Sequence, residues 1–335
     1  MMKNSEINLF VRPEDTKVSY ADFAGPYKIA IDGYVAEAPK FDEKLPCANF
    51  NHHEGVSRLE TRATSAQVLL SVRMGLFKTF RFNNIPKADV FCNDCDEDVG
   101  LTWFILLNHV LAESIINPML NRLVSVAELM DTTAGMLPLS PDSYILREMA
   151  WIFRPYREFR VNGGLDRRKS EEFRLVIDHV CDRVMSHITG SGEAISLDIS
   201  YIKIGGGNGW SIIEEVGMYG RQGALFDGVK AFVSVRKRST GLWSYSIGRI
   251  SEFIPFPVQN LLTLLNIAEA HALGGQNNMK DSWGGGTTIG GSPRTVGSKN
   301  SPEKIEFLIN KSLELLADNG GLLTDSVVDR FKAIL

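Results

Sequence analysis

Residues 88–113 have the sequence ADVFCNDCDEDVGLTWFILLNHVLAE. The mostly apolar residues 88–92 predict a strand, the polar residues 93–98 predict a loop, and the apolar run 99–113 predicts a helix. The same alternation surrounds this stretch, because residues 27–31 predict another strand and further helices are predicted at 64–80 and 119–130. Strands that alternate with helices of this length are typical of an α/β domain with a mainly parallel sheet.

The second half of the chain predicts a smaller α/β domain. Its strand-like segments are rich in Val, Ile, Tyr and Trp, and its helical segments have apolar residues at helical spacing. The predicted strands are 194–204, 229–236 and 242–247, and the predicted helices are 258–272 and 302–317.

A charged, amphipathic segment, residues 170–188, predicts a helix that connects the two halves. We therefore expect a first domain over 1–165, a connecting helix within 166–192 and a second domain over 193–335. The run Gly205-Gly206-Gly207-Asn208-Gly209 favours a hairpin turn, because no Lys-Ser/Thr follows it as in a phosphate-binding Walker loop.

The overall charge argues against a protein that wraps long nucleic acid. The 335 residues include 36 Lys and Arg against 40 Asp and Glu, which gives a formal net charge of −4, whereas such binding usually needs a positive surplus. No run of about 18 apolar residues is present, and residues 1–14 are polar. We expect a cytoplasmic protein with no membrane span.

The four cysteines do not indicate a metal or redox site. Cys92-x-x-Cys95 lacks a second ligand pair at zinc spacing, and its acidic neighbours would raise the pKa of a thiol instead of lowering it. We expect ordinary buried thiols.

The acidic run 93–98 is the densest chemical signal. Four carboxylates stand within five residues, at Asp94, Asp96, Glu97 and Asp98. One or two of them could simply cap the following helix. Four together repel one another, and a divalent cation would supply the opposing charge. In open parallel sheets ligands bind beyond the carboxyl ends of the strands, where this loop is predicted to lie.

A histidine pair and two single aspartates complete a possible metal site. His52 and His53 are adjacent in a chain that has only six His, so one could bind metal while the other faces a substrate phosphate. Asp32 follows a predicted strand and Asp131 follows a predicted helix. Carboxylates and imidazoles of this kind can hold two ions about 3.5–4 Å apart. Mixed oxygen and imidazole ligands suit Mn²⁺ or Mg²⁺.

This set resembles the DHH phosphoesterase superfamily of metal-dependent enzymes. The triplet Asn51-His52-His53 is similar to the Asp-His-His motif, and Asp96-Glu97-Asp98 is similar to the family's Asp-x-Asp motif, with Asp94 as an additional carboxylate. Asp131 matches the family's late aspartate, and Asp32 looks like the aspartate that bridges the two metals. The resemblance implies two Mn²⁺ or Mg²⁺ ions on Asp32, His52, Asp94, Asp96, Asp98 and Asp131. It also implies catalytic roles for Asn51, His53 and Asp98.

The second half is similar to the substrate-binding domain associated with this superfamily. Ser234-Val235-Arg236 looks like its Ser-x-Arg strand, and the loop 283–294 has the glycines of its Gly-Gly-Gly-His loop. Thr287 stands where the family has His. The resemblance implies that Arg236, Gly285, Gly286 and Arg294 contact the substrate.

Two further departures leave two functions open. The acidic motif follows the His pair instead of preceding it, and Asn51 replaces the motif's aspartate, so that Asn51→Asp would be expected to strengthen the site. The first function is a phosphohydrolase or phosphodiesterase that acts on a small phosphorylated substrate or a short single-stranded oligonucleotide. The second is a catalytically weakened or inactive relative that binds a nucleotide or a partner. A homodimer is possible in either case.

Overall fold

The computed structural model describes residues 5–15, 18–42, 44–275 and 281–335. The chain forms two compact units, each with its own sheet. The first unit is Met1–Gly135 with Asp142–Ser196, and the second is Met136–Pro141 with Leu197–Leu335. An α/β fold with a mainly parallel first sheet is therefore confirmed.

The sheet of the first unit has the strand order β1-β6-β2-β4-β3, and the short β5 pairs with β6. Four neighbouring strands, β1, β6, β2 and β4, run parallel, whereas β3 and β5 are antiparallel to their neighbours. The carboxyl ends of the parallel strands consequently share one edge of the sheet. The strands are β1 (Glu6–Val11), β2 (Lys28–Ile31), β3 (Lys40–Asp42), β4 (Cys47–Phe50), β5 (Arg81–Phe82) and β6 (Ile85–Cys92).

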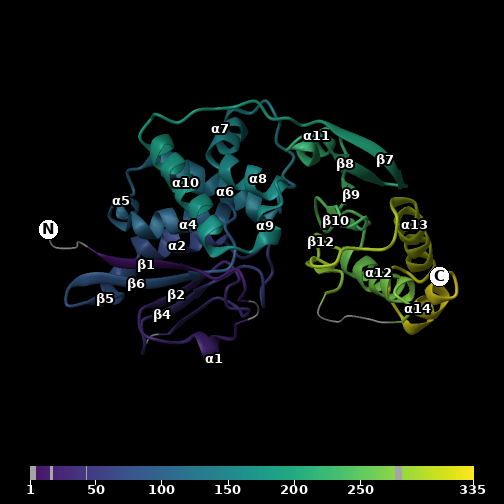
Figure 1. Cartoon of the computed structure of the whole chain (residues 1–335), viewed down its shortest axis with the longest axis horizontal. Helices are drawn as coiled ribbons and strands as arrows, with labels where there is room; N and C mark the ends of the chain where they lie inside the picture. Colours follow the sequence, from purple (N-terminus) through teal and green to yellow (C-terminus); the bar gives the residue numbers. More distant parts are fainter. Residues whose placement is uncertain (1–4, 16–17, 43, 276–280) are drawn as a thin grey trace. The chain divides into compact units, whose positions relative to one another are not determined.

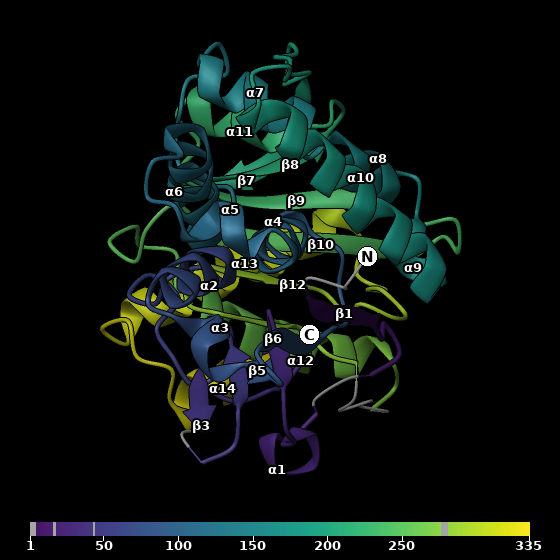
Figure 2. The same ribbon diagram turned by 90° about the vertical axis from the view of Figure 1, so that its left-hand side faces the viewer.

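The helices α2, α4, α6, α7, α8 and α10 lie above this sheet in Figure 1, whereas α1 lies below it, and Figure 2 shows α2 and α4 next to each other. The apolar run after the acidic loop forms α4, which is buried because α2, α6 and α10 all pack against it. The helices are α1 (Tyr20–Phe23), α2 (Thr64–Arg73), α3 (Leu76–Thr79), α4 (Glu97–Leu107), α5 (His109–Glu113), α6 (Pro118–Thr132), α7 (Tyr144–Ile152), α8 (Arg154–Val161), α9 (Gly164–Arg167) and α10 (Ser170–Ile188).

The expected role of residues 170–188 as a connection between domains is wrong. The helix α10 has the predicted bounds, but it belongs to the first unit. Its Cys181 thiol donates to the carbonyl of Gly100 on α4, and a Cβ added at Gly100 would lie 2.8 Å from Val180 Cγ1. The apolar face of α10 is buried against α4, so the amphipathic pattern reflects packing within one core.

Two predicted helices are each divided in the structure. The segment 64–80 forms α2 and α3, which are separated at Gly75, whose φ of +99° no helix allows. The segment 99–113 forms α4 and α5, with Asn108 between them. The strand β1 lies in the polar segment 1–14, where none was expected.

The second unit contains a sheet of strand order β11-β12-β10-β9-β8-β7, in which only the pair β8 and β9 is parallel. The predicted hairpin at 205–209 is confirmed, but Gly205–Gly207 belong to β7 and only Asn208 and Gly209 connect it to β8. Residues 194–200 precede β7 without strand structure, and β8 was not expected. The elements are β7 (Tyr201–Gly207), β8 (Trp210–Glu215), α11 (Gly220–Phe226), β9 (Ala231–Lys237), β10 (Trp243–Arg249), α12 (Val258–Ala272), β11 (Gly284–Gly285), β12 (Ile289–Gly291), α13 (Pro302–Asp318) and α14 (Asp325–Lys332).

Two sequence expectations concern the interior and the membrane. All four cysteines are free and buried, as predicted, and burial raises the pKa of the Cys92 and Cys95 thiols, with a further rise from Asp94 and Asp96. Within the described residues, no helix combines the length and the apolar character that crossing a membrane requires.

Candidate metal centre

The candidate site lies at the carboxyl ends of neighbouring parallel strands. Asp32 directly follows β2, and His52 and His53 come just after β4, its neighbour in the sheet. The backbone N–H of Asp32 donates to Phe50 O at 2.9 Å, which ties the two strand ends together. Asp32 has a φ of +51°, a left-handed conformation that is uncommon outside glycine and often found at functional sites.

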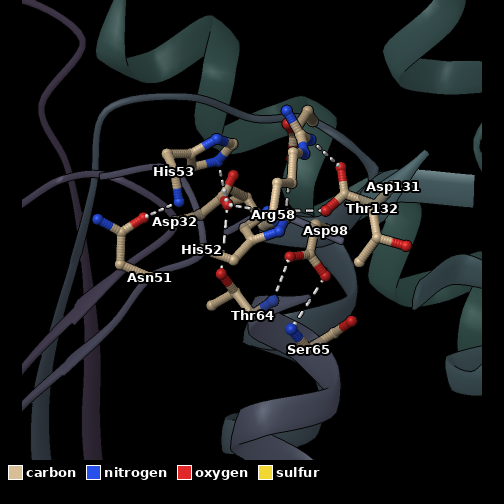
Figure 3. Close-up of polar contacts among 12 residues, drawn as sticks. Asp32, Asn51, His52, His53, Arg58, Thr64, Ser65, Asp98, Asp131 and Thr132 are labelled. Carbon is tan, nitrogen blue, oxygen red and sulfur yellow. Dashed lines mark hydrogen bonds and ion pairs between the residues drawn. The ribbon is translucent and has the colours of Figure 1, made fainter. Parts of the chain in front are cut away.

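The two imidazoles converge on Asp32 (Figure 3). His53 Nε2 lies 2.8 Å from Asp32 Oδ1, and His52 Nε2 lies 3.4 Å from the same oxygen. The hydroxyl of Thr64 also donates to this oxygen, at 3.2 Å. Three groups therefore share one carboxylate oxygen whose residue is only 7% exposed.

A second carboxylate meets His52 from helix α6. Asp131 lies in the last turn of α6 instead of after it, and its Oδ2 is 2.8 Å from His52 Nε2. The other oxygen, Oδ1, accepts a hydrogen bond from Arg58 Nη2 at 3.0 Å. His52 is thus held between Asp32 and Asp131, and its side chain is completely buried.

Asp98 connects the site to two helices. It lies in the first turn of α4, and its two oxygens accept hydrogen bonds from the backbone N–H groups of Thr64 and Ser65, at 2.7 and 2.9 Å. Thr64 and Ser65 begin α2, which has no side-chain cap of its own. Asp98 therefore supplies the missing N-terminal partner of α2 from a distant part of the chain.

The other predicted acidic ligands lie beside this centre. Asp96 is the N-cap of α4, where its side chain accepts a hydrogen bond from the N–H of Val99 at 3.0 Å. Asp94 Oδ1 accepts a hydrogen bond from the N–H of Cys95 at 2.7 Å. One of the two roles weighed for the acidic run, a helix cap, is therefore filled by Asp96.

The carboxylates at this edge repel one another. Burial raises the pKa of Asp98 to about 7, and the charges of Asp131 and Asp32 add to the effect. Burial, together with Asp32, Asp94 and Asp131, raises the pKa of Asp96 well above its usual range. A cation among these groups would relieve the repulsion and favour their ionised forms.

The histidines compensate part of this negative charge. Burial alone would lower the pKa of His52, but the contacts with Asp131 and Asp32 outweigh it and raise this pKa to about 10. The pKa of His53 is likewise raised by Asp32 against the effect of burial. In turn, the two histidines hold the pKa of Asp32 well below its usual range although burial opposes this. Binding of a metal to these imidazoles would release their protons.

The residues offer two sets of potential ligand atoms, and the atoms within each set lie within 4.8 Å of one another. Asp32, His52 and His53 form one set, and His52, Asp98 and Asp131 form the other. Within the described residues, His52 Nδ1 is buried and has no hydrogen-bond partner, whereas His52 Nε2 and Asp131 Oδ2 contact each other at 2.8 Å without hydrogen-bond geometry. Buried polar atoms without partners are rare, and imidazole nitrogen and carboxylate oxygen are donors that suit Mn²⁺. These residues therefore fit a divalent cation. Neither set includes Asp94 or Asp96.

The side chain of Asn51 shapes the turn that carries the histidines. Its Oδ1 accepts a hydrogen bond from the backbone N–H of His53 at 2.9 Å and not from an imidazole (Figure 3). Its amide nitrogen donates to Val35 O at 3.2 Å, Glu37 O at 2.9 Å and Glu54 Oε2 at 2.7 Å. The amide is fully buried and holds the backbone, which an aspartate could not do in the same way.

The four predicted substrate-binding residues all lie in the second unit. Arg236, at the end of β9, and Arg294 are exposed. Gly285 has a φ of +153°, and a Cβ added there would lie 2.3 Å from Gly290 Cα, so strand packing alone explains this glycine. Gly286 follows it, and its N–H donates to Ile289 O at 2.8 Å.

Sequence reasoning missed Arg58, Thr64 and Ser65. Thr64 and Ser65 were expected only as the start of a helix, and nothing in the sequence reveals that Asp98 lies against them. Arg58 follows the His pair by five residues, and its position near an acidic and histidine-rich motif was the one available signal.

Comparisons of the chain with models of known families, with curated proteins and with solved structures find no match.

Proposed function

We propose that this protein is a metal-dependent phosphoesterase whose centre is His52. The observation that carries the proposal is the completely buried His52 ring, which lies between Asp32 and Asp131 with no well-formed hydrogen bond among the described residues. Asp98, which belongs to one ligand set with His52, has a pKa that burial raises to about 7. The likeness of Asn51-His52-His53 and the aspartates to the DHH phosphoesterase motifs supports the same reading.

Asp32, His52 and His53 would hold one ion, and His52, Asp98 or Asp131 would contribute to a second. Bound Mn²⁺ or Mg²⁺ would supply a hydroxide nucleophile at neutral pH and polarise the phosphoryl group. Asp32 contacts His53 and Asp131 contacts His52, so the side chains of each set already lie side by side. The roles of Arg236 and Arg294 in holding the substrate stay predictions, as does the alternative of a non-catalytic relative.

Metal titration followed by a hydrolysis assay tests the proposal. We expect the purified protein to bind Mn²⁺ or Mg²⁺ in calorimetry and to hydrolyse bis(p-nitrophenyl) phosphate, a short single-stranded oligonucleotide or pyrophosphate only with metal. His52→Gln and Asp131→Asn should weaken metal binding by about 100-fold or more, beyond the 10–100-fold that is typical of groups that only orient a ligand.

Asp178→Asn is the matched control, because Asp178 is a half-exposed aspartate on α10 that pairs with Arg174. It should leave metal affinity and hydrolysis unchanged. Circular dichroism must show that all three variants are folded. A wild-type protein that binds metal but hydrolyses none of the substrates would favour the non-catalytic alternative, and one that binds no metal would refute the phosphoesterase.

A further inference from the structure

Arg58 reaches into the metal centre from the segment between the histidine pair and α2 (Figure 3). Its Nη2 donates to Asp131 Oδ1 at 3.0 Å, and the other oxygen of this carboxylate lies 2.8 Å from His52 Nε2. The guanidinium is therefore separated from the central imidazole by one carboxylate. Its charge is also close enough to lower the pKa of His53.

The Nε and Nη2 groups form one edge of the Arg58 guanidinium, and of these two only Nη2 makes a hydrogen bond within the described part of the chain. Its Nε is buried and has no hydrogen-bond partner among the described residues, although Nη2 on the same edge is bonded. Arg62, four residues later, makes the complete arrangement with a carboxylate of the same helix, α6. Its Nε and Nη2 both donate to Glu128 on α6, at 2.8 and 2.9 Å. Arg62 thus makes a bidentate ion pair, whereas among the described residues the buried Nε–H donor of Arg58 has no acceptor.

A buried charged donor without an acceptor is costly, so a missing acceptor is the simplest explanation. Charge indicates what this acceptor is. Once cations occupy the atoms of His52, Asp32 and Asp131, the carboxylate that now neutralises Arg58 would be shared with a metal. The guanidinium and the ions would then repel each other unless an anion lay between them. A phosphoryl group has the charge and the paired oxygens that a guanidinium edge matches.

Resting on the proposed function, we infer that Arg58 binds the phosphoryl group of the substrate through its Nε edge. Asp131 positions the side chain through Nη2. The first unit then carries its own anion-binding residue beside the ions, in addition to any contribution from the arginines of the second unit. The competing explanation is mechanical: Arg58 and Arg62 would together fasten the segment 51–63 to α6.

Inorganic phosphate and a matched pair of variants separate the two explanations. Arg58→Gln and Arg58→Lys are compared with Arg62→Gln, which removes the neighbouring ion pair from the same segment and helix. For each protein, calorimetry measures binding of Mn²⁺ or Mg²⁺, then binding of inorganic phosphate at a saturating concentration of that ion and without it. Thermal unfolding midpoints are recorded in parallel.

With the ion bound, Arg58→Gln should weaken phosphate binding by about 10–100-fold, which is the effect expected for loss of a charge-assisted hydrogen bond. Metal affinity should stay equal or rise, because a cation that competes for Asp131 has been removed. Arg58→Lys should bind phosphate more tightly than Arg58→Gln does but less tightly than the wild type, since lysine restores the positive charge without the paired donors of a guanidinium. With bis(p-nitrophenyl) phosphate, KM should rise more than kcat falls. Arg62→Gln should change neither phosphate nor metal binding.

Two results would overturn the inference. In one, phosphate binding is the same in Arg58→Gln as in the wild type. In the other, Arg58→Gln and Arg62→Gln lower the unfolding midpoint, metal affinity and phosphate affinity together, as a mechanical role requires. Failure of the proposed function has a different signature, since the wild type would then bind no metal. In that case the inference would still stand or fall on whether metal-free phosphate binding depends on Arg58.

Discussion

Asn51 needs an amide and not a carboxylate, because its side-chain nitrogen donates hydrogen bonds. Three acceptors surround its amide nitrogen: the carbonyls of Val35 and Glu37 and the carboxylate of Glu54. A carboxylate at this position cannot donate to any of them and would add a buried negative charge beside Glu54. The amide is therefore a requirement of this turn, whatever the resemblance to an aspartate motif suggests.

We predict that Asn51→Asp destabilises the metal-free protein by more than about 2 kcal/mol, because buried groups lose their hydrogen-bond partners. This reverses the expectation from the motif, in which the aspartate would strengthen the site. Urea unfolding measures the change. Asn84→Asp is the control, since Asn84 lies in an exposed turn with a φ of +62° that aspartate also tolerates. An Asn51→Asp protein that is as stable as the Asn84→Asp control would contradict the prediction.

The sequence predicted individual residues of the centre where their chemistry is unusual. Adjacent histidines and a dense acidic run are rare, so His52, His53 and Asp98 could be selected without a structure. Arg58 and Thr64 could not, because a single arginine or threonine is common and its role depends on a partner far away in the chain. Asp131, for example, is 73 positions from Arg58.

At the scale of elements, α4 and α10 approach closely at one glycine. Gly100 on α4 faces Val180 on α10, and an added Cβ would lie 2.8 Å from Val180 Cγ1. Alanine in a helix interior gains about 1 kcal/mol over glycine, whereas overpacking a core costs about 1–3 kcal/mol. Val180 is fully buried, so it has no free space into which to move.

We predict that Gly100→Ala lowers the free energy of unfolding by up to about 2 kcal/mol, since the clash outweighs the gain in helix propensity. The test is a double-mutant cycle with Val180→Ala, followed by urea unfolding. In the Val180→Ala background the same Gly100→Ala change should be neutral or stabilising. Equal effects in both backgrounds would mean that the two helices do not compete for this space.

Helix α10 also carries a buried histidine next to α7. The His187 side chain is 2% exposed, its Nδ1 lies 3.7 Å from Glu148 Oε1, and Glu148 pairs with Arg122. Burial lowers the pKa of His187, and Arg122 lowers it further, against the opposing effect of Glu148. The unfolded chain therefore takes up this proton at a higher pH than the folded protein does.

We predict that His187 makes the protein sensitive to acid. Its contribution to stability is present above its unfolded pKa of about 6.5 and is lost as the pH falls from there through the folded pKa. Urea unfolding between pH 7.5 and pH 5, with chelator present, should show a smaller loss of stability for His187→Gln than for the wild type. His271→Gln, at an exposed position on α12, should retain the wild-type loss. If His187→Gln also retains it, other groups cause the acid sensitivity.

Helices and strands could be predicted where the spacing of apolar residues agrees with residues that typically begin or end such an element. The helix at 258–272 was predicted with its observed bounds, since a proline precedes its regular apolar pattern and a Leu-Gly-Gly sequence follows it. The breaks at Gly75 and Asn108 were missed because the apolar pattern continues through them. The strand β8 was missed because it directly follows the turn of a glycine-rich hairpin.

At the scale of the whole molecule, the chain builds two cores and crosses between them more than once. Residues 136–141 belong to the second unit although the segments before and after them belong to the first. The proposed metal ligands lie only in the first unit. A separate polar network organises the second unit, where the buried Glu269 accepts hydrogen bonds from Trp283 Nε1, Ser298 Oγ, Lys299 N and Asn300 Nδ2.

We predict that metal stabilises the two units unequally. A ligand that binds only the folded first unit stabilises that unit by about 2.7 kcal/mol at 100 times its dissociation constant, and it adds nothing to a core that does not contact it. Calorimetric unfolding with saturating Mn²⁺ should therefore shift one transition upward relative to the same protein with chelator. Two marker variants identify the transitions: Gly100→Ala should lower that of the first unit and Glu269→Gln that of the second. The prediction requires the Mn²⁺ shift to appear in the transition that Gly100→Ala lowers. A shift of the transition that Glu269→Gln lowers, with the other one unmoved, would place the bound ion in the second unit and remove His52 from the centre of the proposed site.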